Sequence, residues 1–151
     1  MQSQSRSQSL DILQELIYKA DFIIHLAGVN RSVDEAQFDH INNDLSKYIC
    51  NVIAKFIKET KSKKPILFTS STQATNSTAY GISKLNAEKH FIKLHEETNN
   101  SVYIIRLPNI FGKWCKPNYN SVVATFCSNI ANDLPIKVND PNHNFIKTFN
   151  K

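Results

Sequence analysis

Apolar side chains recur at helical spacing in four separate stretches of the chain. Residues 10–19, 42–59, 80–97 and 121–132 each place apolar positions three or four residues apart, the spacing that lines one face of an α-helix. The stripe is most complete in residues 42–59. We therefore predict four amphipathic helices, each with one buried face.

Three short, continuous apolar runs lie between these helices, at residues 22–28, 66–71 and 102–107. Runs of this length without alternation are typical of buried parallel strands. Helices and strands therefore alternate along the chain, which predicts a parallel sheet with right-handed crossovers and helices on both faces. His25 lies inside the first run, and we predict a packed, hydrogen-bonded core histidine rather than a catalytic one.

The two ends of the chain differ from this pattern. Residues 1–9 are rich in Ser and Gln, and we expect a disordered lead-in there. Residues 10–140 form the expected α/β domain, since 151 residues are enough for one domain. Residues 141–151 are polar, and we expect an irregular tail.

The formal net charge of +5 changes this picture little. The cations are mostly lysines scattered along predicted helix faces, and the one dense cluster, at Lys61, Lys63 and Lys64, falls in a predicted loop. A solvated face explains this distribution better than a nucleic-acid interface does. No apolar run approaches the roughly 18 residues that a membrane span requires, so we expect no membrane insertion.

The cysteines indicate a reducing compartment. Cys50, Cys115 and Cys127 are far apart in the sequence and odd in number, so they provide neither the close pairs of a metal site nor a disulfide framework. The histidines show no metal-ligand spacing either. We therefore predict a cytoplasmic protein without a bound metal.

Candidate chemistry gathers where the predicted strands end. Ligands of parallel α/β sheets bind at the carboxyl ends of the strands, which here means residues 25–31, 69–75 and 107–116. All three stretches are richer in polar and small residues than the strands before them. We expect the site to form from these stretches and from the helix that follows the second one.

That helix begins with a tyrosine and a lysine four residues apart, Tyr80 and Lys84, which lie on one helical face. The lysine charge favours the phenolate and so lowers the pKa of the tyrosine from its ordinary value of about 10. A hydroxyl of Ser70 or Ser71 can hold a substrate oxygen beside the phenol. These groups can exchange a proton with a carbinol while a hydride moves elsewhere.

Simpler explanations stand beside this one. Tyr80 and Lys84 could be an ordinary surface pair, and Ser71 could cap the backbone at the end of its strand. Trp114 and Tyr119 either stack on a ligand or cover the edge of the core. The sequence does not separate these alternatives.

Four segments come in the order that one protein family shows. They are the apolar run of residues 21–28, the Thr-Ser-Ser strand end of residues 69–71, the Tyr-Gly-Ile-Ser-Lys helix start of residues 80–84 and the Arg-Leu-Pro-Asn-Ile-Phe-Gly segment of residues 106–112. Together they resemble the extended short-chain dehydrogenase/reductase family, which includes the nucleotide-sugar epimerases and dehydratases. Residues 109–127 are similar, more narrowly, to capsular-polysaccharide reductases that act on a 4-keto sugar nucleotide. The resemblance covers residues 11–140.

The resemblance implies roles for individual residues. Tyr80 would be the catalytic acid/base, Lys84 its activator and a contact to the cofactor ribose, and Ser71 the group that positions the substrate oxygen. The other implied contacts are Leu26, Ala27 and Gly28 beside the cofactor, Asn42 on the next helix, Leu107 and Pro108 on the nicotinamide side, and Asn109 on the sugar nucleotide. The implied cofactor is NADP or NAD, and the implied substrate is a nucleotide sugar.

The family's opening strand, Gly-rich turn and helix are missing from this sequence. That unit holds the cofactor pyrophosphate, whereas the only glycines here are Gly28, Gly81 and Gly112. We therefore expect a partial Rossmann-like, doubly wound parallel sheet that lacks its first strand–turn–helix unit, in a chain truncated at both ends. We also expect the isolated chain to bind NADP(H) weakly or not at all.

Three functions remain open at this point. The first is NAD(P)-dependent reduction or epimerisation of a nucleotide-activated keto-sugar for capsular or surface polysaccharide synthesis. The second is a truncated, inactive remnant. The third is a module that binds a sugar nucleotide, or that associates with a second copy or an intact paralogue through an exposed sheet edge, without binding a cofactor.

Overall fold

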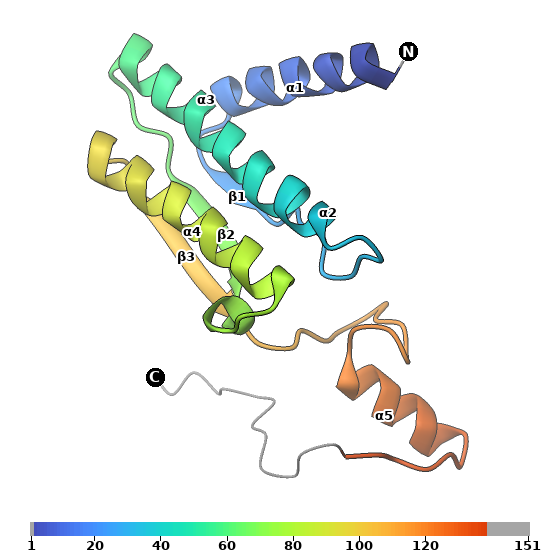
Figure 1. Cartoon of the computed structure of the whole chain (residues 1–151). Coiled ribbons are helices and arrows are strands. Elements are labelled where there is room, and N and C mark those ends of the chain that lie inside the picture. The colour runs from blue at the N-terminus through green and yellow to red at the C-terminus, as the bar shows by residue number, and fades with distance from the viewer. Residues whose placement is uncertain (1, 139–151) are drawn as a thin grey trace. The chain divides into compact units, whose positions relative to one another are not determined.

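The structure, a computed structural model, describes residues 2–138, with side chains from residue 8 onward. The described chain divides into two compact units, and the division falls between Arg106 and Leu107 in the sequence. The elements up to this boundary are α1 (Gln2–Lys19), β1 (Ile23–His25), α2 (Ala36–Phe38), the π-helix η1 (Asp39–Asp44), α3 (Leu45–Thr60), β2 (Ile66–Ser71), the 3₁₀-helix η2 (Thr72–Thr75), α4 (Ala79–Thr98) and β3 (Val102–Leu107) (Figure 1). The second unit contains α5 (Val122–Ala131).

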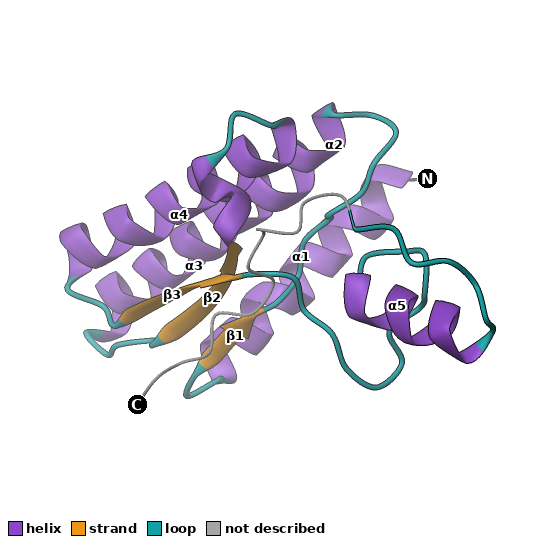
Figure 2. Ribbon diagram, turned by 90° about the horizontal axis from the view of Figure 1, so that it is seen from below, coloured by secondary structure: helices purple, strands orange, loops and turns teal. Residues whose placement is uncertain are grey.

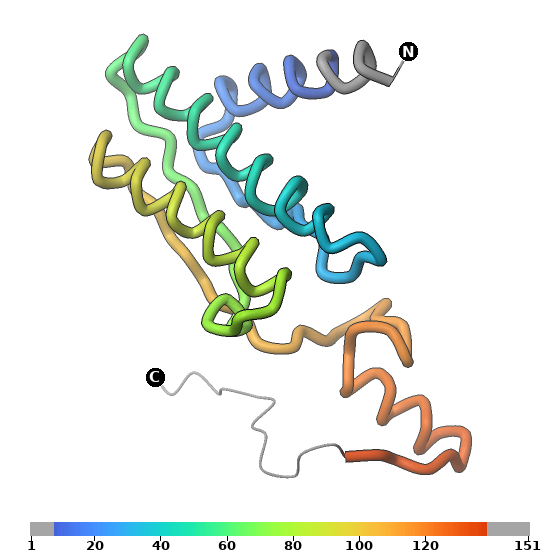
Figure 3. Tube along the Cα trace, viewed as in Figure 1, coloured from blue at the N-terminus to red at the C-terminus, as the bar shows by residue number. Residues whose placement is uncertain are grey.

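The alternation of helices and strands predicted from the apolar pattern is confirmed, and Figure 3 follows it along the chain. Two boundaries differ. Helix α1 begins at Gln2, so residues 2–9 are helical rather than a disordered lead-in; extending a helix that has already formed costs little, even for Ser and Gln. The expected domain of residues 10–140 is divided at Arg106–Leu107, and the expected tail, residues 141–151, lies outside the described residues.

The three strands form one sheet in the order β1-β2-β3. Strands β1 and β2 are parallel, with Ile23 opposite Ile66 and His25 opposite Phe68. Each strand is added on the same side of the one before it, and crossovers of a single hand then place every connecting helix on the same face. Figure 2 shows α3 and α4 side by side on that face. The prediction of helices on both faces is therefore wrong for residues 2–106.

The core lies between this helical layer and the sheet. Strand β2 contributes Ile66 and Phe68, α3 contributes Ile53, and α4 contributes Phe91, all at most 1% exposed. The rings of Phe68 and Phe91 stack with centroids 4.7 Å apart. His25 stacks on Phe68 at 5.3 Å and is itself 5% exposed. The prediction of a packed core histidine is confirmed.

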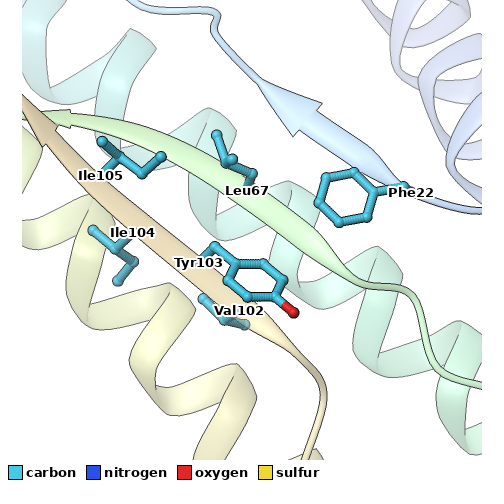
Figure 4. A pocket seen from close by; sticks show the side chains of 6 residues that line it. All are labelled: Phe22, Leu67, Val102, Tyr103, Ile104 and Ile105. Atoms are coloured by element: carbon cyan, nitrogen blue, oxygen red, sulfur yellow. The ribbon is translucent and has the colours of Figure 1, made fainter. Parts of the chain in front are cut away.

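The opposite face of the sheet carries apolar side chains that remain exposed. Alternation along the strands turns Ile24, Leu67 and Tyr103 away from the helices, and Ile24 and Tyr103 are 61% and 52% exposed. The ring of Phe22 stacks on that of Tyr103 at 6.2 Å. Phe22, Leu67 and Tyr103, together with Val102, Ile104 and Ile105, line a shallow hollow of about 540 Å³ (Figure 4). In the described part of the chain, no helix is both long and apolar enough to cross a membrane.

Candidate functional site

The segment after β1 is held in place by the side chain of Asn42. The Asn42 amide donates from Nδ2 to the Val29 carbonyl at 2.9 Å and accepts at Oδ1 from the Val29 N–H at 2.8 Å. Nδ2 also donates to Ser83 Oγ on α4 at 3.0 Å. One buried amide in η1 therefore joins the segment after β1 to the first turns of α4.

Gly28 lies directly beside this amide. A Cβ at position 28 would be 2.9 Å from Asn42 Oδ1 and 3.7 Å from Lys84 Nζ. The absence of a side chain therefore lets the backbone after β1 approach the lysine closely. Leu26 and Ala27, the residues between β1 and Gly28, are exposed. Sequence reasoning expected this stretch to run beside a cofactor.

The turn after β2 packs tightly against the start of α4. Ser71 caps η2, its Oγ accepting from the Gln73 N–H at 3.1 Å, and Thr78 caps α4 by accepting from the Gly81 N–H at 3.0 Å. A Cβ at Gly81 would be 2.3 Å from the Gln73 carbonyl oxygen. Only glycine permits this approach, so it fixes where the first turn of α4, with Tyr80, begins.

Lys84 is buried at the carboxyl end of β2. Its Nζ donates to the Thr69 carbonyl at 2.8 Å and lies 4.5 Å from the centroid of the Phe68 ring. Burial lowers the pKa of Lys84 to about 8, and the negative charge of Glu88 opposes this shift. The ammonium therefore remains charged at neutral pH and sits at the edge of the sheet where ligands of this fold class bind.

Tyr80 lies one helical turn before Lys84 and is half-buried. Its ring packs edge-on against Phe38 of α2, with centroids 5.8 Å apart. Its backbone carbonyl accepts from Ser83 Oγ at 2.8 Å. The same Ser83 hydroxyl accepts a hydrogen bond from the Asn42 amide, so it links η1 to the helix at Tyr80. The first turns of α4 are thus fixed by contacts from α2 and η1 as well as from η2.

Burial keeps His25 neutral near this site. Its Nε2 lies 3.2 Å from Ser46 Oγ, and Ser46 Oγ donates to the Asn42 carbonyl at 2.7 Å, so the imidazole Nε2–H is the donor of the first bond. Desolvation, followed by the positive charge of Lys84, lowers the pKa of His25 to about 4. Lys84 thus faces a neutral imidazole on β1.

Ser70 and Ser71 have different partners, although they are neighbours. Ser70 Oγ donates to the carboxylate of Glu88, which uses its only hydrogen. Ser71 Oγ accepts from the Gln73 N–H, and its own hydrogen is not used by that contact. The capping role considered for Ser71 is therefore present, and it is compatible with donation to a ligand.

Leu107, Pro108 and Asn109 belong to the second unit. Leu107 and Pro108 are half-buried, whereas Asn109 is exposed. The Asn109 amide donates to the Asn120 carbonyl at 2.8 Å, which closes the loop between β3 and α5. The structure groups Gly28, Tyr80 and Lys84 in the first unit, and the expected contacts of Leu107, Pro108 and Asn109 stay predictions.

Sequence reasoning missed an ion pair next to Lys84. Arg106 donates from Nε to Glu88 Oε1 at 2.9 Å and from Nη2 to Oε2 at 2.6 Å. The available signal was the position of Glu88, four residues after Lys84 and three before the buried Phe91. A carboxylate on the inner face of a helix requires a partner, and Arg106 lies at a strand position that faces the helices.

Comparison with known proteins gives consistent results. Residues 5–144 match the model of the NAD dependent epimerase/dehydratase family. The chain is 46% identical over 136 residues to the UDP-2-acetamido-2,6-beta-L-arabino-hexul-4-ose reductase of Pseudomonas aeruginosa strain PA103, a match that covers 90% of this chain and 36% of that protein. The chain therefore spans little more than a third of the length of this curated relative.

Solved structures agree with the sequence matches. The capsular polysaccharide assembling protein CapF of Staphylococcus aureus has a TM-score of 0.65 and 47% identity, over 88% of this chain and 35% of that one. The UDP-glucuronic acid 4-epimerase of Bacillus cereus, solved in complex with NAD, has a TM-score of 0.66 at 16% identity, over 82% of this chain and 42% of that one. The second likeness is one of fold alone, and it confirms the Rossmann-like α/β class.

Proposed function

This chain belongs to the NAD-dependent epimerase/dehydratase family, and on that premise we propose that it carries the proton-transfer half of an NAD(P)-dependent reduction. The substrate would be a nucleotide-activated 4-keto sugar, as the name of the Pseudomonas relative indicates for that protein. Epimerisation is the alternative outcome of the same chemistry. The product would feed capsular or surface polysaccharide synthesis.

One observation carries the proposal. A buried, charged Lys84 lies at the carboxyl end of β2, one helical turn after Tyr80, and its Nζ would be 3.7 Å from a Cβ at Gly28. A structural lysine elsewhere in the fold shows the contrast: Lys64 Nζ donates to the carbonyls of Tyr18 and Ala20 at the end of α1. Lys84 has one such carbonyl, at Thr69, and an ammonium has three hydrogens to donate.

The proton chemistry follows from these positions. In the reduction direction the phenol of Tyr80 gives its proton to the substrate carbonyl oxygen, and the carbonyl carbon receives a hydride, which a reduced nicotinamide supplies when bound. The ammonium of Lys84 stabilises the phenolate left behind. Ser71 Oγ, whose lone pair receives the Gln73 N–H, donates its hydrogen to the same substrate oxygen. In the oxidation direction each transfer reverses.

The residues present fit one end of the cofactor. Gly28 leaves the space that a Cβ would fill beside Lys84, and the lysine offers donors to ribose hydroxyls. Leu26 and Ala27 would border the same space, and the family resemblance implies that Leu107 and Pro108 contact the nicotinamide. The chain has only 3 glycines, none in a Gly-rich phosphate-binding motif, so pyrophosphate contacts would have to come from outside these 151 residues.

The compartment belongs to the same proposal. Cys50, Cys115 and Cys127 are all free thiols in the structure, as expected for a protein of the reducing cytoplasm. We place the protein there, with a nucleotide sugar as its small-molecule partner and Asn109 as a contact to that sugar nucleotide.

Weak binding can be measured by NMR. Millimolar NADPH or NADH, added to the ¹⁵N-labelled chain, should shift the amide resonances of Gly28, Tyr80 and Lys84, and the Lys84→Met variant should lose this response. Lys89→Met, an exposed site on the same helix, is the matched control. Shifts that avoid the carboxyl ends of the strands would contradict the proposal, and micromolar affinity by calorimetry would contradict the expectation of weak binding.

Turnover tests the role of Tyr80. With a UDP-linked 4-keto sugar and NADPH, any reductase activity should disappear in Tyr80→Phe and persist in Tyr103→Phe, which changes a tyrosine on the far face of the sheet. Retained turnover in Tyr80→Phe would remove Tyr80 from the mechanism.

A second function is favoured by the glycine content alone. A chain without a pyrophosphate loop can still bind a sugar nucleotide without a cofactor. In that case a UDP-sugar shifts the resonances of Ser71 and Asn109, whereas NADPH shifts none, and no variant has turnover.

A further inference from the structure

The carboxylate of Glu88 is held by both neighbouring strands. It lies on α4 one turn after Lys84 and is 3% exposed. Arg106 of β3 contacts it through two parallel hydrogen bonds, at 2.9 and 2.6 Å, the fork geometry in which guanidinium binds carboxylate most strongly. Ser70 of β2 donates a third hydrogen bond to Oε1.

Two successive turns of α4 are thereby fixed to two successive residues of β2. Lys84 donates to the Thr69 carbonyl, and Glu88 accepts from the Ser70 hydroxyl. A slide of α4 along the strand would break both contacts, and Arg106 adds a fixed point on β3. Since Tyr80 lies on the same helix, one turn before Lys84, these contacts also set how far its phenol reaches beyond the strand ends.

The charges of Glu88 and Lys84 are coupled as well. Burial acts most strongly on Glu88 and opposes its ionisation, but hydrogen bonds from Arg106 and Ser70, together with the charges of Arg106 and Lys84, outweigh burial and lower its pKa. Glu88 in turn partly offsets the loss of basicity that burial imposes on Lys84. The other group facing Lys84 is His25 on β1, which is neutral at pH 7.

We propose that Glu88 is a positioning residue for Tyr80 and Lys84: anchored by Arg106 and Ser70, its carboxylate fixes α4 on the sheet and balances the buried ammonium. This role rests on the proposed function insofar as Tyr80 and Lys84 are the reacting pair. The geometry itself needs neither cofactor nor substrate, so it can be tested without them.

The test is the titration of Lys84 in the full chain, followed by the ¹³Cε resonances of labelled lysine, with Lys84→Met assigning the signal. Glu88→Gln keeps the shape of the side chain and removes its charge, so the Lys84 pKa should fall below the native value by about one pH unit or more. Glu97→Gln removes an exposed carboxylate that pairs with Lys93 at 3.6 Å on the same helix, and it should leave the Lys84 titration unchanged.

A carboxylate that only packed α4 on the sheet, without acting on the charge of Lys84, would leave the Lys84 titration unchanged when it is removed. An unchanged Lys84 titration in a folded Glu88→Gln chain would overturn the proposal. If Glu88→Gln does not fold, the double variant Glu88→Met with Arg106→Met serves instead, because it removes both members of the ion pair and leaves neither as an unpaired charge; it should lower the Lys84 pKa as well. Since no ligand is present, failure of the proposed reduction would leave this result unaffected.

Discussion

At the scale of single residues, the backbone at Gly28 is the point where a small change has a large effect. A Cβ there would lie 2.9 Å from Asn42 Oδ1, inside van der Waals contact, and Asn42 cannot withdraw without breaking its bonds to Val29 and Ser83. The close approach that suits cofactor binding is therefore also a packing requirement.

We expect Gly28→Ala to lower the free energy of unfolding by about 1–3 kcal/mol, the range for an added methyl in a packed site. Gly112→Ala is the matched control, because a Cβ at Gly112 meets nothing within 4 Å, and it should change stability by about 0.5 kcal/mol or less. Urea unfolding followed by circular dichroism gives both values. Equal effects of the two variants would show that the contact with Asn42 is unimportant.

His25 makes stability depend on pH. Its pKa is 6.5 in the unfolded chain and about 4 when folded, so the unfolded state binds more protons between these values, and stability is lost as the pH falls through that window. From pH 7 to pH 5 the loss should be about 2 kcal/mol. His90 acts in the same direction, because burial lowers its pKa too, ahead of the charges of Lys47 and Lys93. His25→Gln should therefore show a smaller loss in urea unfolding at the two pH values; an identical loss would contradict the assignment.

Residue patterns predicted the placement of Tyr80 and Lys84 on one helix, and both lie on α4, while their catalytic roles stay predictions. The spacing of Tyr80 and Lys84 indicates a shared helical face, and the buried lysine at the strand end agrees with it. The ion pair of Glu88 and Arg106 could not be predicted, because the two residues come from different elements and meet only through the register of α4 on the sheet. Periodicity fixes which face a residue occupies but not how far along a strand the helix lies.

At the scale of elements, the first turn of α4 depends on Gly81. Alanine is the better helix former by about 1 kcal/mol, and helix propensity alone would make Gly81→Ala stabilising. The added Cβ would, however, lie 2.3 Å from the Gln73 carbonyl oxygen and 2.7 Å from that of Asn76. These are backbone atoms of the turn that Ser71 caps, and they cannot move independently.

We therefore expect Gly81→Ala to destabilise the chain by about 2 kcal/mol or more, measured as a lower midpoint of thermal or urea unfolding. Ile92→Ala on the same helix, at a side chain 45% exposed, should have a much smaller effect. A stabilised Gly81→Ala chain would mean that propensity outweighs the contact with the turn.

Element positions were the most predictable level. Continuous apolar runs predicted the positions of the three strands, and apolar residues at helical spacing predicted those of the long helices. Both follow because a buried face requires apolar residues at the spacing of its secondary structure. The start of α1 could not be located this way, since residues 2–9 bear no apolar stripe. The π-helix η1 was also missed, because one wide turn leaves the apolar spacing almost unchanged.

At the scale of the whole molecule, the sheet is covered by helices of residues 2–106 on one face only. When three parallel strands are added in one direction and all crossovers have the same hand, the connecting helices lie on one face of the sheet. No pattern of residues indicated this, because Ile24, Leu67 and Tyr103 are as apolar as the strand residues that face the core. Apolar runs show that a strand is suited to burial on both faces, not that both faces are covered.

We expect the exposed face to bind the dye ANS, whose fluorescence reports accessible apolar surface. The double variant Ile24→Thr with Tyr103→Thr keeps good strand formers and should reduce the fluorescence at least about twofold, in proportion to the area removed. Ile92→Gln, on the outer side of α4, should reduce it little. A dye signal that is insensitive to the strand substitutions would locate the binding surface elsewhere.

The π-helix η1 has a consequence for how chain length and the site are linked. A π turn contains one residue more than the α-helical turn it replaces, so deleting a single residue between Phe38 and Leu45 would convert the stretch into regular α-helix. A π turn advances less per residue than the roughly 100° of an α-helix, so a deletion after Asn42 would rotate the amide that binds Val29 around the axis relative to α3. The loop after β1 would then lose its anchor while the helix itself gained a better hydrogen-bond ladder. The extra residue of η1 therefore keeps the loop after β1 anchored, and it makes the helix less regular.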